Sequence, residues 1–100
     1  MQNVKTPWYI LNAPEIGNAY REFDEACREE GVLNRKTKEL LMMALACVLR
    51  CDHCTEEHLQ GALDAGASKS EVTEALLIAA DESARTQLAW CREIFVKNLK

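Results

Sequence analysis

The stretch NRKTKELLMMALACVLRCDHCTEEH, residues 34–58, decides the fold of this chain. Its first half is apolar around much of a helix's circumference between Leu40 and Leu49, and such a helix lies at the centre of a fold rather than on its surface. Asn34 can cap this helix through its side-chain oxygen. In the cysteine-rich half we expect a second helix, which begins near Asp52 and ends just before Gly66.

Apolar residues at helical spacing continue on both sides of this stretch. From Pro14 they recur every three or four positions, and Gly31 stands where that helix would end in a left-handed residue. Ser68 and Glu71 have the spacing of a capping box, which predicts another helix. The chain has only four Gly and two Pro, which are too few for the many turns of a β-sandwich or β-barrel. We therefore expect an all-α fold of about five helices.

The length of 100 residues predicts a single domain, 1–100, in which residues 1–13 form an N-terminal arm. Residues 81–83, Asp-Glu-Ser, either break the helix that follows Ser68 or lie within one long helix, and the sequence leaves both open. The last segment has a wide apolar face, formed by Leu88, Trp90, Cys91, Ile94, Phe95 and Leu99. Either a partner subunit or the chain's own helices can cover this face.

Charge and hydropathy exclude two classes of partner. Twelve Lys plus Arg against sixteen Asp plus Glu give a net charge of −4, whereas nucleic-acid binding needs a basic patch. No apolar run approaches the roughly 20 residues that span a bilayer, so we expect no membrane partner. The start, residues 1–7, lacks the apolar core of a signal peptide, which favours a cytoplasmic location. In that reducing compartment five cysteines form no disulfide framework, and some of them are candidates for chemistry.

Two cysteines and a histidine carry the strongest chemical signal. Cys51 and Cys54 are separated by two residues at a helix start, where unpaired N–H groups favour thiolates and a small disulfide ring can close. His58 lies one turn after Cys54 on the same face, the arrangement that an activated cysteine nucleophile needs. We expect Cys27 and Cys91, on apolar stripes, to be core residues.

Glu39 is the one carboxylate in the stretch from Glu39 to Leu49, and a carboxylate buried there would have either an unusual pKa or a hydrogen bond to a histidine. A continuous helix would place it about 18 Å from Cys51. The chain must therefore turn near Arg50 and fold back so that His58 approaches Glu39. Either the two helices cross at an angle, or a neighbouring subunit contributes.

A motif in this sequence resembles the signature of AhpD-like proteins, the alkylhydroperoxidase members of the carboxymuconolactone decarboxylase superfamily. The motif consists of Glu39, eleven intervening residues, Cys51-x-x-Cys54 and, after three further residues, His58. The flanks 34–40 and 61–72 agree with it. The resemblance implies an all-α homo-oligomer, a trimer or hexamer. It also implies a redox-active cysteine pair on which the carboxylate and histidine act through a proton relay. His53 is an auxiliary candidate.

This resemblance and the residues together predict a thiol oxidoreductase that acts on a small hydroperoxide or a partner protein's disulfide. It needs no organic cofactor, and the sequence does not name its electron donor. We assign Cys54 as the attacking thiol and Cys51 as the resolving thiol, and the reverse assignment stays open. The family often has a Gly-rich break where this chain has Asp-Glu-Ser-Ala at 81–84, so the geometry of the oligomer-forming segment stays undecided.

Two other functions stay open. One is a decarboxylase-like lyase that uses Glu39 and His58, although the superfamily's decarboxylases lack the cysteine pair. The other is a non-catalytic oligomeric or metal-binding module. Zinc on Cys47, Cys51, Cys54 and His58 is a minority alternative, because on one helix this stripe would extend about 16 Å.

Overall fold

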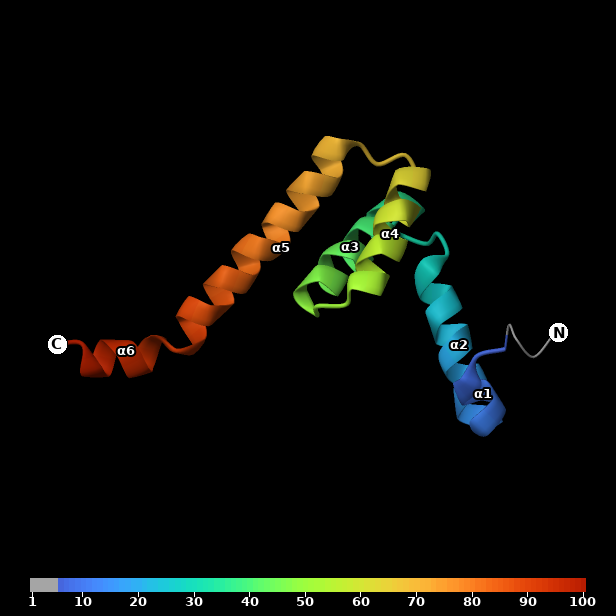
Figure 1. The fold of residues 1–100 in the computed structure, drawn as a ribbon, viewed down its shortest axis with the longest axis horizontal. Coiled ribbons are helices and arrows are strands. Elements are labelled where there is room, and N and C mark those ends of the chain that lie inside the picture. Colours follow the sequence, from blue (N-terminus) through green and yellow to red (C-terminus); the bar gives the residue numbers. More distant parts are fainter. Residues whose placement is uncertain (1–5) are drawn as a thin grey trace. The chain divides into compact units, whose positions relative to one another are not determined.

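Six α-helices form the regular structure of residues 6–100, the part of the chain that the computed structural model describes (Figure 1). They are α1 Trp8–Asn12, α2 Pro14–Arg28, α3 Arg35–Val48, α4 Asp52–Asp64, α5 Lys69–Trp90 and α6 Arg92–Asn98. The described residues contain no strand, so the predicted all-α fold is confirmed. None of these helices is both long and apolar enough to cross a membrane.

The chain divides into two units, Met1–Asn34 and Arg35–Lys100. The prediction of a single domain stays a prediction. In the first unit, α1 packs against the start of α2 at Gly17, where a Cβ atom would lie 2.8 Å from the Cα of Ile10. An edge-to-face contact between Tyr9 and Tyr20, with centroids 5.4 Å apart, also joins the two helices.

Two expectations for this first unit were wrong. Trp8–Asn12 is helical where we expected an arm, because contacts with α2 stabilise a helix too short to show a periodic pattern. Residues 1–5 of that arm lie outside the described residues. The first long helix, α2, does not end in a left-handed glycine at Gly31. It ends at Arg28, and Glu29 leaves it in an extended conformation with φ −75° and ψ 156°.

In the second unit, α3 and α4 form an antiparallel hairpin that turns at Arg50 (Figure 1). Arg50 has a left-handed φ of 62°. Its N–H bonds Cys47 O at 3.2 Å, and the N–H of Cys51 bonds Ala46 O at 3.0 Å, which together are the two bonds of a Schellman motif. The expected turn near Arg50 is therefore present.

The same motif ends α4, this time with a glycine. Gly66 has a φ of 98°, and the N–H of Ala67 bonds Ala62 O at 2.9 Å. Ala62 is fully buried, and Met43 of α3 is nearly so. This small apolar core holds the hairpin together and fixes the facing sides of α3 and α4.

The predicted capping box opens α5. Glu71 N–H bonds Ser68 Oγ at 3.1 Å, and Glu71 Oε1 accepts the Ser68 N–H at 2.9 Å. Glu71 Oε2 also pairs with Lys36 Nζ at 2.9 Å, which ties the start of α5 to the start of α3. The backbone hydrogen bond from Ser68, followed by the bond from Lys36, lowers the pKa of the Glu71 carboxyl.

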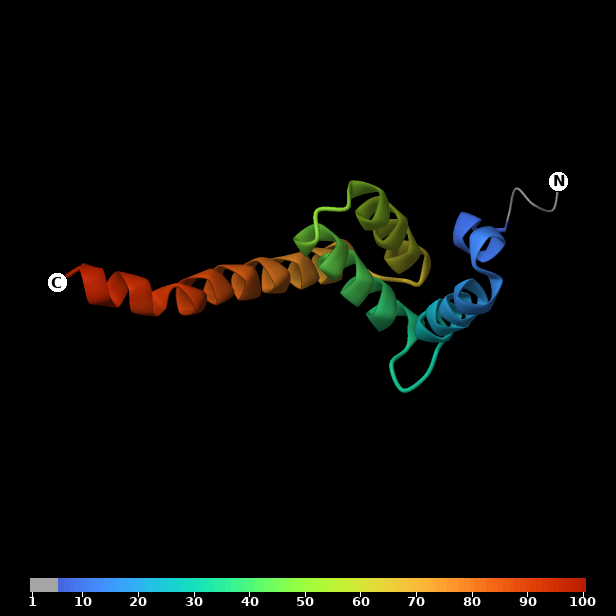
Figure 2. The same cartoon turned by 90° about the horizontal axis from the view of Figure 1, so that it is seen from below.

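The helix α5 passes unbroken through residues 81–84 and ends at Trp90, and α6 begins at Arg92 after the cap residue Cys91. Figure 2 shows α5 extending from the α3–α4 hairpin toward α6. Neither helix contains a buried residue. Large apolar side chains are exposed on both helices, with Trp90 of α5 82% and Ile94 of α6 58% exposed.

Candidate active site

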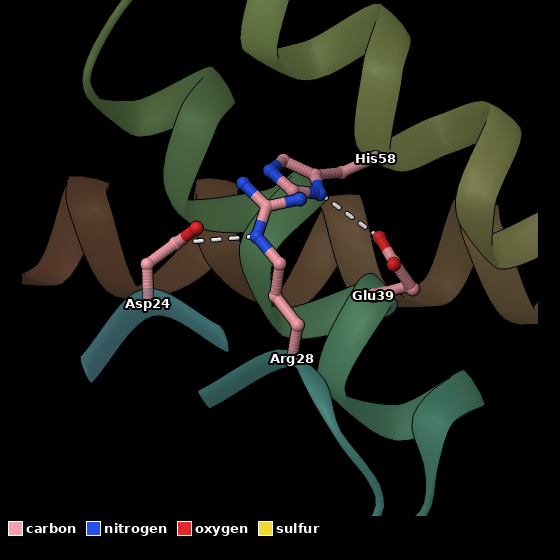
Figure 3. Close-up of polar contacts among 4 residues, drawn as sticks. All are labelled: Asp24, Arg28, Glu39 and His58. Atoms are coloured by element: carbon pink, nitrogen blue, oxygen red, sulfur yellow. Dashed lines mark hydrogen bonds and ion pairs between the residues drawn. The ribbon is translucent and has the colours of Figure 1, made fainter. Parts of the chain in front are cut away.

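A buried carboxylate–imidazole pair joins α3 to α4. His58 Nδ1 lies 2.9 Å from Glu39 Oε1, and the two residues are only 7% and 8% exposed (Figure 3). When the carboxyl group is ionised it can only accept a hydrogen bond, and in that state Nδ1 is the donor of this contact. The hairpin thus brings together two residues that are 19 positions apart in the sequence. Figure 3 also draws the Asp24–Arg28 ion pair, which joins two residues of α2 in the first unit.

Gly61, one turn after His58 on α4, leaves room for the Glu39 carboxyl group. A Cβ atom at this position would lie 2.6 Å from Oε1, 2.7 Å from Cδ and 3.0 Å from Oε2 of Glu39. The carboxyl group therefore packs directly on the α4 backbone. The sequence reasoning missed this residue, although a glycine inside a helical pattern is itself a signal of a close contact.

Cys51 and Cys54 form a disulfide at the start of α4, with Cα atoms 5.3 Å apart. Cys51 is the N-cap residue, and its Sγ accepts the N–H of Cys54 at 3.2 Å. Both cysteines are half-buried, and Cys54 precedes His58 by one turn of the same helix. The four residues predicted for the site therefore lie on one helical hairpin, with Glu39 and His58 in contact and the two cysteines joined at the start of α4.

The remaining candidates lie around this hairpin. The side chain of His53 is exposed on the first turn of α4, and its auxiliary role stays a prediction. Cys47 is half-buried on the last turn of α3, 3.7 Å from the hydroxyl of Thr55. Cys27 is exposed and Cys91, between α5 and α6, is only half-buried, so their expected place in the core was wrong. Apolar spacing predicts one face of a helix but does not by itself bury that face. In residues 6–100 no three His, Cys, Asp or Glu side chains are grouped to hold a metal ion.

The fold and the site define a small all-α domain in which one helical hairpin holds a Cys-x-x-Cys disulfide and a buried Glu–His pair. A sequence model of one protein family, described as the carboxymuconolactone decarboxylase family, matches residues 14–95. The chain belongs to this family, which includes AhpD-type enzymes as well as decarboxylases. The family assignment inferred from the motif is thereby confirmed.

Individual proteins resemble the chain over shorter lengths. A Paracoccus denitrificans protein, "Uncharacterized protein 4 in cox locus", is 33% identical over 66 residues, which are 66% of this chain and 60% of that protein. An "Uncharacterized protein" of Haemophilus influenzae is 41% identical over 49 residues, 49% of this chain and 43% of that protein. The chain thus spans less than two thirds of either relative, and neither name states an activity.

A solved structure shares both the fold and part of the sequence. The crystal structure of a Methanobacterium thermoautotrophicum protein, a structural-genomics target, has a TM-score of 0.77 and 34% identity to this chain. The structural match covers 87% of this chain and 98% of the other protein. The arrangement of helices described above therefore recurs in a crystallised relative.

Proposed function

We propose that this protein is a thiol-based oxidoreductase in which Cys51 and Cys54 alternate between dithiol and disulfide. Its substrate is a small hydroperoxide or the disulfide of a partner protein. The observation that carries the proposal is the buried 2.9 Å bond between His58 Nδ1 and Glu39 Oε1, one helical turn from Cys54. The redox equivalents reside in the two sulfurs, so the reaction needs no organic cofactor.

In the proposed reaction, His58 activates Cys54. The Glu39 carboxylate accepts the Nδ1 hydrogen and orients the ring, so that Nε2 can take the thiol proton of Cys54. The imidazolium that forms is stabilised by Glu39, and the N–H groups at the start of α4 favour the thiolate. Removal of either Glu39 or His58 should therefore lower the rate at which Cys54 reacts.

The thiolate of Cys54 then attacks a peroxide oxygen. The O–O bond breaks, the alcohol leaves with the proton held by His58, and Cys54 becomes a sulfenic acid. Cys51 attacks this sulfur, water leaves, and the disulfide closes. A donor of two electrons and two protons then restores the dithiol. A partner's disulfide would instead be attacked by the thiolate and resolved by Cys51 in the same order.

Thiol trapping tests the proposal and the roles of the two cysteines. After one equivalent of hydroperoxide, the wild-type chain should lose two of its five thiols, whereas the Cys51→Ser variant should hold a sulfenic acid at Cys54. Cys91→Ser is the matched control and should behave as wild type at the pair. If a sulfenic acid is found only in the Cys54→Ser variant, at Cys51, then Cys51 is the attacking thiol and Cys54 the resolving thiol. Oxidation that spares both Cys51 and Cys54 overturns the proposal.

The Glu39–His58 pair also favours a second candidate, a decarboxylase-like lyase, because a buried carboxylate–imidazole pair can perform acid–base chemistry without any thiol. Alkylation of Cys51 and Cys54 separates the two functions, since it abolishes thiol redox activity and spares the lyase. A non-catalytic oligomeric or metal-binding module would show neither activity. Metal analysis of the purified protein, with a thiol count under mild oxidant, identifies that third case.

We also propose that the chain works as a cytoplasmic homo-oligomer, a trimer or hexamer. The absence of any buried residue in α5 and α6 supports this assembly, because an apolar face of that extent is normally covered. The reducing cytoplasm would supply electrons to the cysteine pair. Light scattering coupled to size-exclusion chromatography tests the assembly, and a monomer at micromolar concentration would contradict it.

A further inference from the structure

Cys47 is a third thiol at the bend that carries the redox pair. It lies on the last turn of α3, and its Sγ is 3.7 Å from Oγ1 of Thr55, the residue that follows Cys54. The same Oγ1 donates a hydrogen bond to Cys51 O at 2.8 Å. One threonine hydroxyl thus contacts both the Cys47 thiol and the backbone of the redox pair.

The backbone of the bend also holds Cys47 beside Cys51. The N–H of Cys51 bonds Ala46 O at 3.0 Å, and Cys47 O accepts the N–H of Arg50 at 3.2 Å. These bonds fold residue 51 back onto the last turn of α3. Side-chain rotation takes picoseconds to nanoseconds at accessible positions, so the distance between the two sulfurs can change without any movement of the backbone.

Cys47 also lines an open cavity of about 390 Å³ between α3 and α5. Arg50, Ser83 and Gln87 are the polar residues that line it together with Cys47. Cys47 therefore contacts Thr55, which is bonded to the backbone of the redox pair, and also lines a cavity that admits a small molecule. The reaction proposed above leaves this third thiol without a role.

We propose that Cys47 is an exchange thiol that takes over the disulfide from the redox pair. The Cys47 thiolate attacks Sγ of Cys51, the Cys51–Cys54 bond breaks, a Cys47–Cys51 bond forms, and Cys54 leaves as a thiolate. One disulfide is consumed and one is formed, so the exchange needs no external oxidant or reductant. The inference rests on the proposed redox function of Cys51 and Cys54.

The environment of the leaving sulfur favours this direction. Cys54 lies in the first turn of α4, where backbone N–H groups stabilise a thiolate, and a better leaving thiolate exchanges faster. The step returns Cys54 to its reactive form beside His58. It also moves the disulfide toward the α3–α5 cavity, where a small thiol reductant can reach Cys47.

Peptide mapping tests the exchange directly, because trypsin cuts after Lys38, Arg50 and Lys69. Cys47 then lies in peptide 39–50, while both members of the pair lie in peptide 51–69. The full chain is oxidised with diamide, incubated, blocked with N-ethylmaleimide at acid pH and digested without reductant. A Cys51–Cys54 bond stays within peptide 51–69, whereas the proposed bond links it to peptide 39–50.

The expected result is a linked peptide pair in the monomeric chain that grows at the expense of the internal disulfide. Cys54→Ser should give the linked pair as its main oxidised product, and the controls Cys91→Ser and Cys27→Ser should match wild type. Cys47→Ser and Cys47→Ala should both slow reduction of the oxidised chain by a small thiol about tenfold, a barrier change of about 1.4 kcal/mol.

The outcomes separate this inference from the proposed function. A stable Cys51–Cys54 disulfide with no linked pair in wild type or Cys54→Ser overturns the exchange and leaves the redox proposal standing. Failure of Cys51 and Cys54 to pair at all overturns the redox proposal itself. Reduction of both Cys47 variants at the wild-type rate also overturns the exchange.

Discussion

Gly61→Ala should destabilise this protein, although helix propensity alone predicts the opposite. Alanine in the middle of a helix is favoured over glycine by about 1 kcal/mol. The added Cβ, however, would lie 2.6 Å from Glu39 Oε1, and normal contact requires the carboxyl group to retreat by about 0.8 Å. Because Gly61 and His58 both lie on α4, a retreat of the carboxyl group away from this helix also lengthens its 2.9 Å bond to His58, by up to about 0.8 Å.

The size of the effect follows from burial. Glu39 is 8% exposed, and a buried group left without its partner costs about 1–3 kcal/mol. After the gain in helix propensity, we expect a net loss of up to about 2 kcal/mol, which lowers Tm by about 4–8 °C for each kcal/mol in a domain of this size. Thermal unfolding measures this loss, and the NMR signals of the His58 ring report the broken bond.

A double-mutant cycle supplies the control for this prediction. With the carboxyl group removed in Glu39→Ala, the Ala at position 61 meets no obstacle and should stabilise α4 by about 1 kcal/mol. The reasoning is refuted if Gly61→Ala alone raises Tm and leaves the His58 ring signals unchanged. Additive effects of the two substitutions would also show that they do not act through the same contact.

Three other predictions concern the ends of the helices. Arg50→Val should destabilise the protein by about 1 kcal/mol or more, measured by urea unfolding, because a β-branched residue tolerates the left-handed φ of 62° worse than arginine does. Arg50→Gly should not destabilise the protein, because glycine adopts this φ readily. Ser68→Ala removes the side-chain cap of α5 and should cost about 1 kcal/mol, measured as a shift of the urea midpoint. The pKa of Glu71 is lower in the folded state than its ordinary value of 4.5, so the ionised carboxylate stabilises the fold. This stabilisation is fully present at a pH above 4.5 and is lost as the pH falls through the lowered pKa of the folded state. Unfolding from about pH 6 to about pH 3 should therefore be less pH-dependent in Glu71→Gln, and equal slopes in the two proteins would contradict this assignment.

Much of the second unit could be predicted from the sequence because its signals are local. The apolar run of α3, the capping box at Ser68, Gly66 as a terminator and the Cys-x-x-Cys at a helix start each act within a few residues. The resemblance to the family motif extended the prediction of the site to Glu39 and His58. Local signals were weaker in the first unit, where α1 is too short for a periodic pattern and α2 ends before its glycine.

The distances across the hairpin were decided by the tertiary structure alone. Whether Glu39 meets His58 within one chain depends on the register of α3 against α4, which the left-handed conformation of Arg50 sets. Arginine rarely adopts a left-handed conformation, so the sequence did not predict the positive φ of Arg50. The glycine at position 61 indicates a close contact, but its partner, the carboxyl group of Glu39, follows only from the register of α3 against α4.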